Sequence, residues 1–194
     1  MKESKSAVRL LYASAVFIAS AVVFCAVFAP LLAPYDPSAV SPEEILEHSS
    51  AAHWFGTDAL GRDILSRVIY GARSSVAFAF CSAFCTMALG LSLGMVSGYF
   101  GGLADKSVQC LVALFQGLPG TSLMIAIAAI LPENDFRIII ALTLTSWTGF
   151  SRIVRNEVLR IKGETYMEGI RSIGAGHWYI LRKYVFPNLL PVLI

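Results

Sequence analysis

An apolar run near the N-terminus constrains this chain most, because it is long enough to cross a lipid bilayer as a helix. The run LLYASAVFIASAVVFCAVFAPLL covers residues 10–32, about 23 residues without a charge, where roughly 20 suffice for a span. A cleaved signal peptide has a shorter apolar core of about 7–15 residues, and this run ends in the proline-rich APLLAPYDP without a clear cleavage site. We therefore predict a retained transmembrane helix after a short N-terminal segment, residues 1–9.

The composition of the whole chain points the same way. Hydrophobic residues make up 56% of the sequence and charged residues only 14%, whereas soluble domains are about one quarter charged. Three further apolar runs follow, at about 75–96, 107–131 and 138–150, and the last is expected to run on toward Val158. Gly90 and Gly94 lie four residues apart in the second run, a spacing that favours close helix packing. We predict an all-α membrane protein with about four transmembrane helices.

The charges of the two long polar segments set the predicted orientation. Residues 33–74 hold six acidic and three basic side chains, whereas residues 151–186 hold seven basic side chains. Lysine and arginine concentrate on the cytoplasmic side of membrane proteins. We therefore predict that the N-terminus and residues 151–186 face the cytoplasm and that residues 33–74 face outside.

Motifs for catalysis or for binding metals and nucleotides are missing from the sequence. It contains no GxxxxGK[ST] or HExxH pattern and no Cys/His metal spacing, and we predict no catalytic residue, no metal and no cofactor in this chain. The net charge of +2 is too small to imply a nucleic-acid partner. The four cysteines, at positions 25, 81, 85 and 110, are predicted to be small buried hydrophobic residues rather than metal ligands or disulfides.

A charged, helix-like segment follows the fourth apolar run. Met167, Ile170 and Ile173 form an i, i+3, i+6 apolar stripe, with Glu164 and Glu168 beside it. The sequence GAG at 174–176 is expected to break this helix, and a second helical run, HWYILRKYVF, is expected to end at a proline, Pro187. Such a segment either lies in the lipid headgroups or docks into the groove of a cytoplasmic partner.

A second polar motif, GTDALGRDILSR, lies in the 33–74 segment. Thr57 or Asp58 is expected to cap a helix, and Asp63 and Arg67 are spaced as an i, i+4 ion pair. We predict that the acidic and basic side chains of this motif stabilise the loop rather than contact a substrate. Contact with a solute-binding protein is the alternative.

Both motifs resemble those of a known family. Glu168, Gly169, Ile170 and Gly174, followed by Phe-Pro-Asn at 186–188, resemble the EAA loop of ABC-importer permeases. HWFGTDALGRDILSRVIYGARSSV at 53–76 resembles the external signature of the dipeptide/oligopeptide/nickel permease family, in particular its C-type subunit. GYFGGLAD at 98–105 and SWTGFSRIVRNEVLRIKGETYMEG at 146–169 extend the similarity over nearly the whole chain.

This resemblance implies a type I ABC-importer transmembrane domain in a bacterial or archaeal cytoplasmic (inner) membrane, with the last two helices missing here. The implied partners are a second homologous permease subunit, two cytoplasmic ATPases that bind ATP and Mg, and an extracytoplasmic solute-binding protein. The implied ATPase-coupling loop lies at about 159–186, and the external loop precedes residue 75. Their expected site residues are Glu164, Met167, Glu168, Gly169, Ile170, Ile173, Gly174 and Pro187 in the first, and Gly56, Thr57, Asp58, Gly61, Arg62, Asp63 and Arg67 in the second.

The expected function is a non-catalytic translocation subunit that couples ATPase closure to alternating access. A secondary transporter or channel subunit is the main alternative, and a membrane-embedded enzyme is a further one. Peptides, nickel and related small solutes all remain open as cargo, because the family handles each of them.

Overall fold

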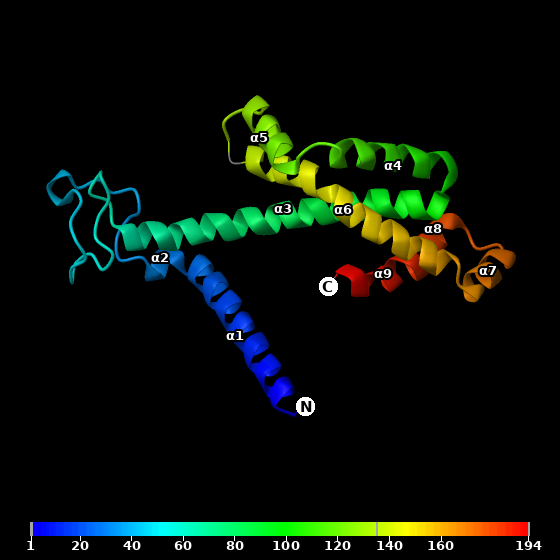
Figure 1. Cartoon of the computed structure of the whole chain (residues 1–194), viewed down its shortest axis with the longest axis horizontal. Coiled ribbons are helices and arrows are strands. Elements are labelled where there is room, and N and C mark those ends of the chain that lie inside the picture. The colour runs from blue at the N-terminus through cyan, green and yellow to red at the C-terminus, as the bar shows by residue number, and fades with distance from the viewer. Residues whose placement is uncertain (1, 135, 194) are drawn as a thin grey trace. The chain divides into compact units, whose positions relative to one another are not determined.

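The computed structural model describes residues 2–134 and 136–193, with side chains for 9–134 and 136–191. Parts of two predicted segments, Met1 and Ile194, lie outside the described residues. The regular elements are α1 (Lys2–Val27), α2 (Ala29–Leu32), the 3-10 turn η1 (Pro42–Glu44), α3 (Ile64–Phe100), α4 (Gly102–Gln116), α5 (Gly120–Ile130), α6 (Phe136–Lys162), α7 (Thr165–Ser172), α8 (His177–Ile180), the π-helical turn η2 (Leu181–Val185) and α9 (Phe186–Leu193). The predicted all-α class is confirmed for the described residues, which add only one isolated bridge, between Thr57 and Asp63 (Figure 1).

The helices that can cross a membrane match the first two predicted apolar runs. In α1, Arg9–Val27 is long and apolar enough to span a bilayer, and so is α3. The third run forms two helices, α4 and α5, which qualify only together and are bent by 93° at their junction. The fourth run lies in α6, which extends through Val158 as expected and is long enough to span a bilayer, but is too polar to qualify. The described residues thus contain two such spans, or three if the bent pair counts as one.

The chain forms two compact units, Met1–Ala79 and Phe80–Ile194. The first unit contains α1, α2 and a polar loop, which we define as residues 33–63. We assigned residues 64–74 to the polar segment, but they form the first turns of α3. Helix α3 starts there because Asp63 accepts a hydrogen bond from the backbone N–H of Ser66, at 2.7 Å, as an N-cap residue does.

A row of glycines in α3 allows the close helix contact on which the second unit is built. A Cβ added to Gly90 would lie 2.8 Å from the ring of Phe150, and one added to Gly94 would lie 2.6 Å from the carbonyl oxygen of Ser151. The predicted close packing is therefore confirmed, with α6 as the partner. The same row continues to Gly98, where an added Cβ would lie 2.8 Å from Val158.

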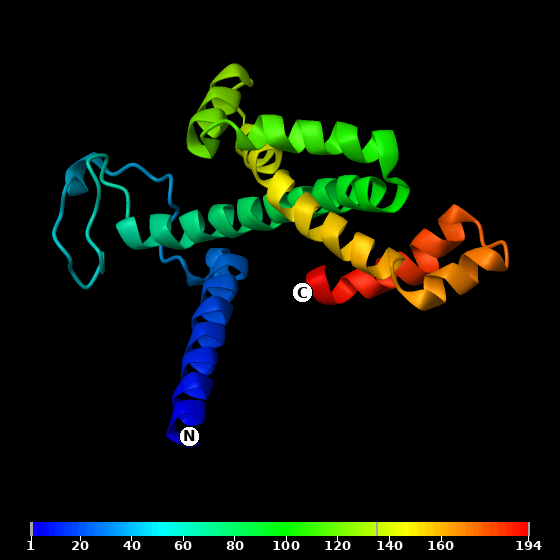
Figure 2. The ribbon, with the colours of Figure 1, turned by 45° about the vertical axis from the view of Figure 1, so that its right-hand side comes forward.

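Helix α6 connects the two ends of this second unit. It contacts α5 and α4 in its first half, where Trp147 packs with Val108 and Val112. From there it runs to the opposite end of the unit, where α7 and α8 form a hairpin and α9 turns back beside α6 (Figure 2). We call residues 165–180, α7 with α8, the α7–α8 hairpin.

Pro187 does not end the second helical run as predicted. Helix α8, η2 and α9 follow one another without interruption from His177 to Leu193, with Pro187 as the second residue of α9. The π-helical turn ends two residues before this proline, which has no N–H to donate to the turn before it. Such π-helical widening is one of the usual ways in which a helix accommodates a break in its hydrogen-bond ladder.

The cysteines are all free, as predicted. Their predicted burial is wrong, because Cys81, Cys85 and Cys110 are exposed and Cys25 is only partly covered. All four lie on helices, three of them within or beside the apolar spans. Their neighbours along these helices are mostly apolar side chains, and packed protein does not fully cover them.

Candidate functional site

The α7–α8 hairpin has the predicted order of helix, glycine turn and helix. Gly174 has a φ of +81°, in the left-handed region that only glycine adopts readily. Its N–H bonds to the carbonyl of Arg171 at 2.9 Å, and the N–H of Ala175 bonds to the carbonyl of Ile170 at 3.3 Å. These two bonds form a Schellman motif, which ends α7 and directs the chain into α8.

The predicted apolar stripe of α7 does not form one face. Met167 is fully buried, Ile170 is partly buried, and Ile173 is 83% exposed. The reason is geometric, because each three-residue step falls about 60° short of a full helical turn. Ile173 is also the C-cap of α7, beyond its last regular turn. Met167 therefore cannot contact a partner, whereas Ile173 can.

Met167 is buried in an apolar cluster of this chain. The cluster combines α3, α6 and the segment from α7 to α9, and its buried members are Tyr99, Val154, Val158, Ile161, Met167, Ile180, Val185 and Leu189. Burial of apolar surface of this kind is the main force that holds a short helix in place. The hairpin is thus seated on its own chain through one side of α7 and one side of α8.

The opposite side of α7 is bare. Tyr166 is 45% exposed, and a Cβ added to Gly169 would meet no atom within 4 Å. The exposed carboxylate of Glu168 makes no hydrogen bond or ion pair within the described part of the chain. Glu164 precedes α7 and lies 3.4 Å from the guanidinium of Arg160. Helix α7 therefore presents tyrosine, glycine, isoleucine and one free carboxylate to its surroundings.

A polar junction that the sequence reasoning missed lies next to this hairpin. Arg155 of α6 donates two hydrogen bonds of 2.6 Å to Asp105 of α4, and the hydroxyl of Ser97 of α3 donates to the same carboxylate at 2.5 Å. Gln109 donates to the hydroxyl of Ser97 at 3.4 Å. Bidentate arginine–carboxylate pairs fix geometry as well as charge. Asp105 and Arg155 both lie in stretches that resemble the permease family, and this was the available signal.

The charge of Asp58 in the polar loop is paired within its own motif, GTDALGRDILSR, whose last residue, Arg67, lies in the first turn of α3. Asp58 accepts hydrogen bonds from the backbone N–H groups of Leu60, at 2.8 Å, and Arg62, at 3.1 Å. Its other oxygen pairs with the guanidinium groups of Arg62 and Arg67. These hydrogen bonds, first of all the one from Arg62, hold the pKa of Asp58 well below its usual range.

Two details of the predicted motif are corrected. Arg67 pairs with Asp58 instead of Asp63, because Asp63 is already occupied as the N-cap of α3. The cap itself is Asp63, and neither Thr57 nor Asp58 serves as one. Thr57 instead bridges the loop, since its hydroxyl donates to the carbonyl of Glu44 and accepts the N–H of Glu47 at 2.9 Å.

Two glycines of the polar loop are required by their surroundings. Gly56 and Gly61 both have a φ of +73°. A side chain at Gly56 would run into the carbonyl of Glu47, and one at Gly61 would run into the backbone of Ser41. These contacts bring the chain before and after the η1 turn against the GTDALGRD stretch.

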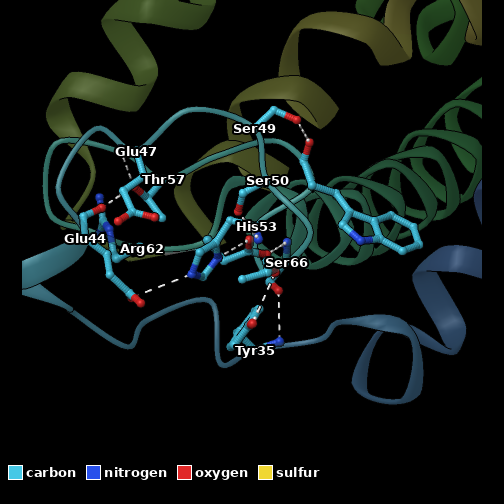
Figure 3. A network of polar contacts seen from close by, with 12 residues as sticks. Tyr35, Glu44, Glu47, Ser49, Ser50, His53, Thr57, Arg62 and Ser66 are labelled. Carbon is cyan, nitrogen blue, oxygen red and sulfur yellow. Dashed lines mark hydrogen bonds and ion pairs between the residues drawn. The ribbon is translucent and has the colours of Figure 1, made fainter.

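His53, which was not among the expected site residues, connects the η1 turn of the polar loop to the start of α3. It is 5% exposed, its Nδ1 lies 2.9 Å from Asp63, and its Nε2 lies 3.6 Å from Glu44 (Figure 3). The ring of Tyr35 packs on it at 4.7 Å. The hydrogen bond with Asp63 raises the pKa of His53. Burial raises the pKa of Asp63, but hydrogen bonds from Ser66 and His53 outweigh it, and the net pKa is lowered.

Metal ligands do not gather in the described residues, where no group of three His, Cys, Asp or Glu side chains could hold an ion. The described residues combine a hydrogen-bonded polar loop with a hairpin of which one side is exposed. Together with the apolar helices, this combination defines an all-helical, multi-pass membrane protein.

Residues 90–194 match the family described as binding-protein-dependent transport system inner membrane component, and the chain belongs to this family. It is 35% identical over 167 residues to the oligopeptide transport system permease protein OppC of Bacillus subtilis (strain 168), which covers 86% of this chain and 55% of that protein. It is 36% identical over 168 residues to the glutathione transport system permease protein GsiD of Pectobacterium atrosepticum, covering 86% of this chain and 56% of the relative.

A third relative is the dipeptide transport system permease protein DppC of Bacillus subtilis (strain 168). The identity is 36% over 178 residues, with 92% of this chain and 56% of the relative covered. The chain thus spans just over half the length of these relatives. The expected membership of the peptide permease family is confirmed.

Proposed function

We propose that this chain is a membrane-spanning subunit of an ATP-driven importer, and that it couples the closure of partner ATPases to alternating access. In this proposal the N-terminus and the α7–α8 hairpin face the cytoplasm, and the polar loop faces outside. The chain hydrolyses nothing itself, and ATP and Mg are bound by two partner ATPases. A second homologous permease subunit completes the path, and a solute-binding protein delivers the cargo at the outer side.

The two-sided character of α7 carries this proposal. Met167 is buried in the chain's own core, while Tyr166, Gly169 and Ile173 are left uncovered beside the free carboxylate of Glu168. A helix that rests on its own chain through one side offers the other side to a groove. A partner that approaches Gly169 meets bare backbone, which permits a close contact that any side chain would prevent.

The proposed cargo is a short peptide. Support comes from the names of the relatives, which transport an oligopeptide, glutathione and a dipeptide respectively. Nickel remains a second cargo of the wider family that the sequence resembles. Uptake assays with labelled di- and tripeptides, competed by a nickel chelate, distinguish the two.

The experiment that tests the coupling role places a bulky side chain on the bare face of α7. Because a Cβ at Gly169 meets open space in this chain, we expect Gly169→Trp to leave the hairpin folded and to block an incoming partner. The matched control is Gly71→Trp, at a glycine of α3 that is equally open and lies on the predicted outer side. The chain is tagged, expressed from its native genomic neighbourhood, and purified from the membrane.

We expect the Gly169→Trp protein to lose the ATPases and keep the second permease, and the Gly71→Trp protein to keep both. Glu168→Ala is expected to weaken ATPase retention in the same direction. Retention of the ATPases by Gly169→Trp would refute the assignment of this face. If the unsubstituted protein brings down no ATPase and its transport depends on sodium or protons, the secondary-transporter alternative replaces the importer.

A further inference from the structure

The last turn of α3, residues 97–100, is the point at which several elements of the Phe80–Ile194 unit are fastened together. Ser97 shares the carboxylate of Asp105 with Arg155, which links α3 to α4 and α6. Two residues further on, the backbone carbonyl of Tyr99 accepts a hydrogen bond of 2.8 Å from the ammonium group of Lys162, at the end of α6. A cationic side chain there satisfies one of the carbonyls that a helix leaves open at its C-terminus.

Tyr99 extends this junction to the α7–α8 hairpin. Its side chain is 4% exposed, and its hydroxyl lies 3.0 Å from Nδ1 of His177, the first residue of α8. The two rings also meet edge to face, with centroids 5.7 Å apart and planes at 80°. Phe100 flanks the same imidazole, at 6.0 Å between centroids. A buried tyrosine hydroxyl normally has such a partner, because an unpaired one is costly.

The contact between Tyr99 and His177 is directional, whereas the burial of Met167 and Ile180 is not. Met167 and Ile180 anchor the hairpin by apolar burial, which fixes position but leaves rotation about the buried side chains inexpensive. A hydrogen bond and an edge-to-face ring contact at the start of α8 oppose that rotation. The hairpin and the last turn of α3 therefore have to move together for as long as the bond holds.

We infer that Tyr99 is a positioning residue, which transmits movement of the α7–α8 hairpin to the junction of α3, α4 and α6 through its hydroxyl contact with His177. This inference rests on the proposed coupling function and specifies where in this chain the coupling occurs. It assigns Tyr99 no contact with ATPase or cargo. Loss of its hydroxyl should therefore leave assembly intact, and less solute should be transported for each ATP that is hydrolysed.

The first test removes only the hydroxyl, with Tyr99→Phe in the assembled transporter. The matched control is Tyr179→Phe, which removes a hydroxyl from the same hairpin that bonds to Lys183 and Tyr184, both in the adjoining η2 turn and outside the junction of α3, α4 and α6. We expect both proteins to retain the ATPases. Solute transported per ATP hydrolysed should fall roughly three- to tenfold in Tyr99→Phe, as the loss of one side-chain hydrogen bond implies, and should be unchanged in Tyr179→Phe.

The second test does not depend on the ATPases. Amide hydrogen exchange is measured on the chain in lipid nanodiscs, with and without Tyr99→Phe. Residues 165–180 should exchange faster in the variant, and His177→Phe should produce the same increase, with no further increase in the double variant. Additivity of the two substitutions would show that the contact is not shared, and would overturn the inference.

The two proposals fail in different ways. Failure of the unsubstituted chain to retain any ATPase refutes the coupling function, while hydrogen exchange still reports whether Tyr99 positions the hairpin. Wild-type transport per ATP together with wild-type hairpin exchange in Tyr99→Phe overturns the inference and leaves the coupling function standing.

Discussion

The polar loop and the α7–α8 hairpin are built from the same kinds of residue and use them in opposite ways. In the polar loop, the carboxylate of Asp58 holds two backbone N–H groups and two arginines, and that of Asp63 holds Ser66 and His53. In the hairpin, Glu168 has no such partner within the described residues. Charges that are paired within the chain stabilise its fold, whereas a free carboxylate on an exposed helix is available to bind a partner protein.

The glycines of the two regions differ in the same way. Gly61 and Gly174 both have a left-handed backbone, at +73° and +81°. Around Gly61 the chain has closed in, so that a Cβ would collide with the backbone of Ser41, whereas around Gly174 there is open space. The comparison teaches that the carboxylates of Asp58 and Asp63 are satisfied by neighbouring residues of the first unit, and that α7 has one side buried on its own chain and one side exposed.

The largest expected effect distinguishes those two sides of the hairpin. Met167→Ala should destabilise α7 by about 2–5 kcal/mol, because it opens a cavity in the core. Tyr166→Ala, on the exposed side, should change stability by less than about 0.5 kcal/mol. Amide hydrogen exchange across residues 165–172 measures both. Equal effects of the two substitutions would mean that α7 is not buried on one side and exposed on the other.

The second prediction compares the two left-handed glycines. Gly174→Ala should cost about 1–2 kcal/mol, the usual price of a left-handed conformation for a residue with a Cβ. Gly61→Ala carries the same conformational cost and a backbone collision in addition, so its effect should be clearly larger. Limited proteolysis of the polar loop and of the hairpin, followed by mass spectrometry, locates the damage. A smaller effect at Gly61 would contradict the crowding around it.

Much of the fold could be predicted from sequence, because its determinants are local. The length and apolarity of residues 10–32 and 75–96 define helices, GAG at 174–176 defines a helix break, and a Gly-x-x-x-Gly spacing defines a close contact. The start of α3 is predicted too late in the sequence, because the apolar run begins after the helix does. The helix itself starts at the Asp63 cap, and a polar residue can be helical without contributing hydropathy.

The site was predicted less well, because it depends on which side of a helix is covered. Helical periodicity indicates that Met167 and Ile173 lie on different sides of α7, but only the cluster of α3, α6 and α9 side chains decides that the first is buried. The contacts of Asp105 with Arg155 and of Tyr99 with His177 join residues 50 and 78 positions apart. Such pairs follow from the packing of α3 on α6, which single-sequence periodicity does not contain.

A matched pair of carboxylates gives the third prediction. Asp58→Asn removes the charge that both arginines share and should increase amide exchange throughout residues 56–62. Glu168→Gln should leave exchange in its own helix unchanged, since its carboxylate supports nothing in the described chain. Co-purification of the ATPases should show the reverse pattern, with Glu168→Gln the more harmful. A loosened α7 in Glu168→Gln would show that the carboxylate has an internal role after all.

The smallest expected effect is a pH dependence confined to the polar loop. The pKa values of Asp58 and Asp63 are lowered by folding, so the stability they provide is present above the unfolded value of about 3.9 and is lost as the pH falls through the folded values. The pKa of His53 is raised by folding, so its contribution is complete below about 6.5 and is lost as the pH rises through the folded value. Exchange in residues 41–63 should therefore be slowest between about pH 4 and 6.5, after correction for the intrinsic pH dependence of exchange.

His53→Gln should abolish the loss of stability on the alkaline side and leave the loss on the acid side in place, because the arginines still hold Asp58. If the loss of stability at alkaline pH persists in His53→Gln, another group causes it. His53 would then not be one of the charges that stabilise the polar loop.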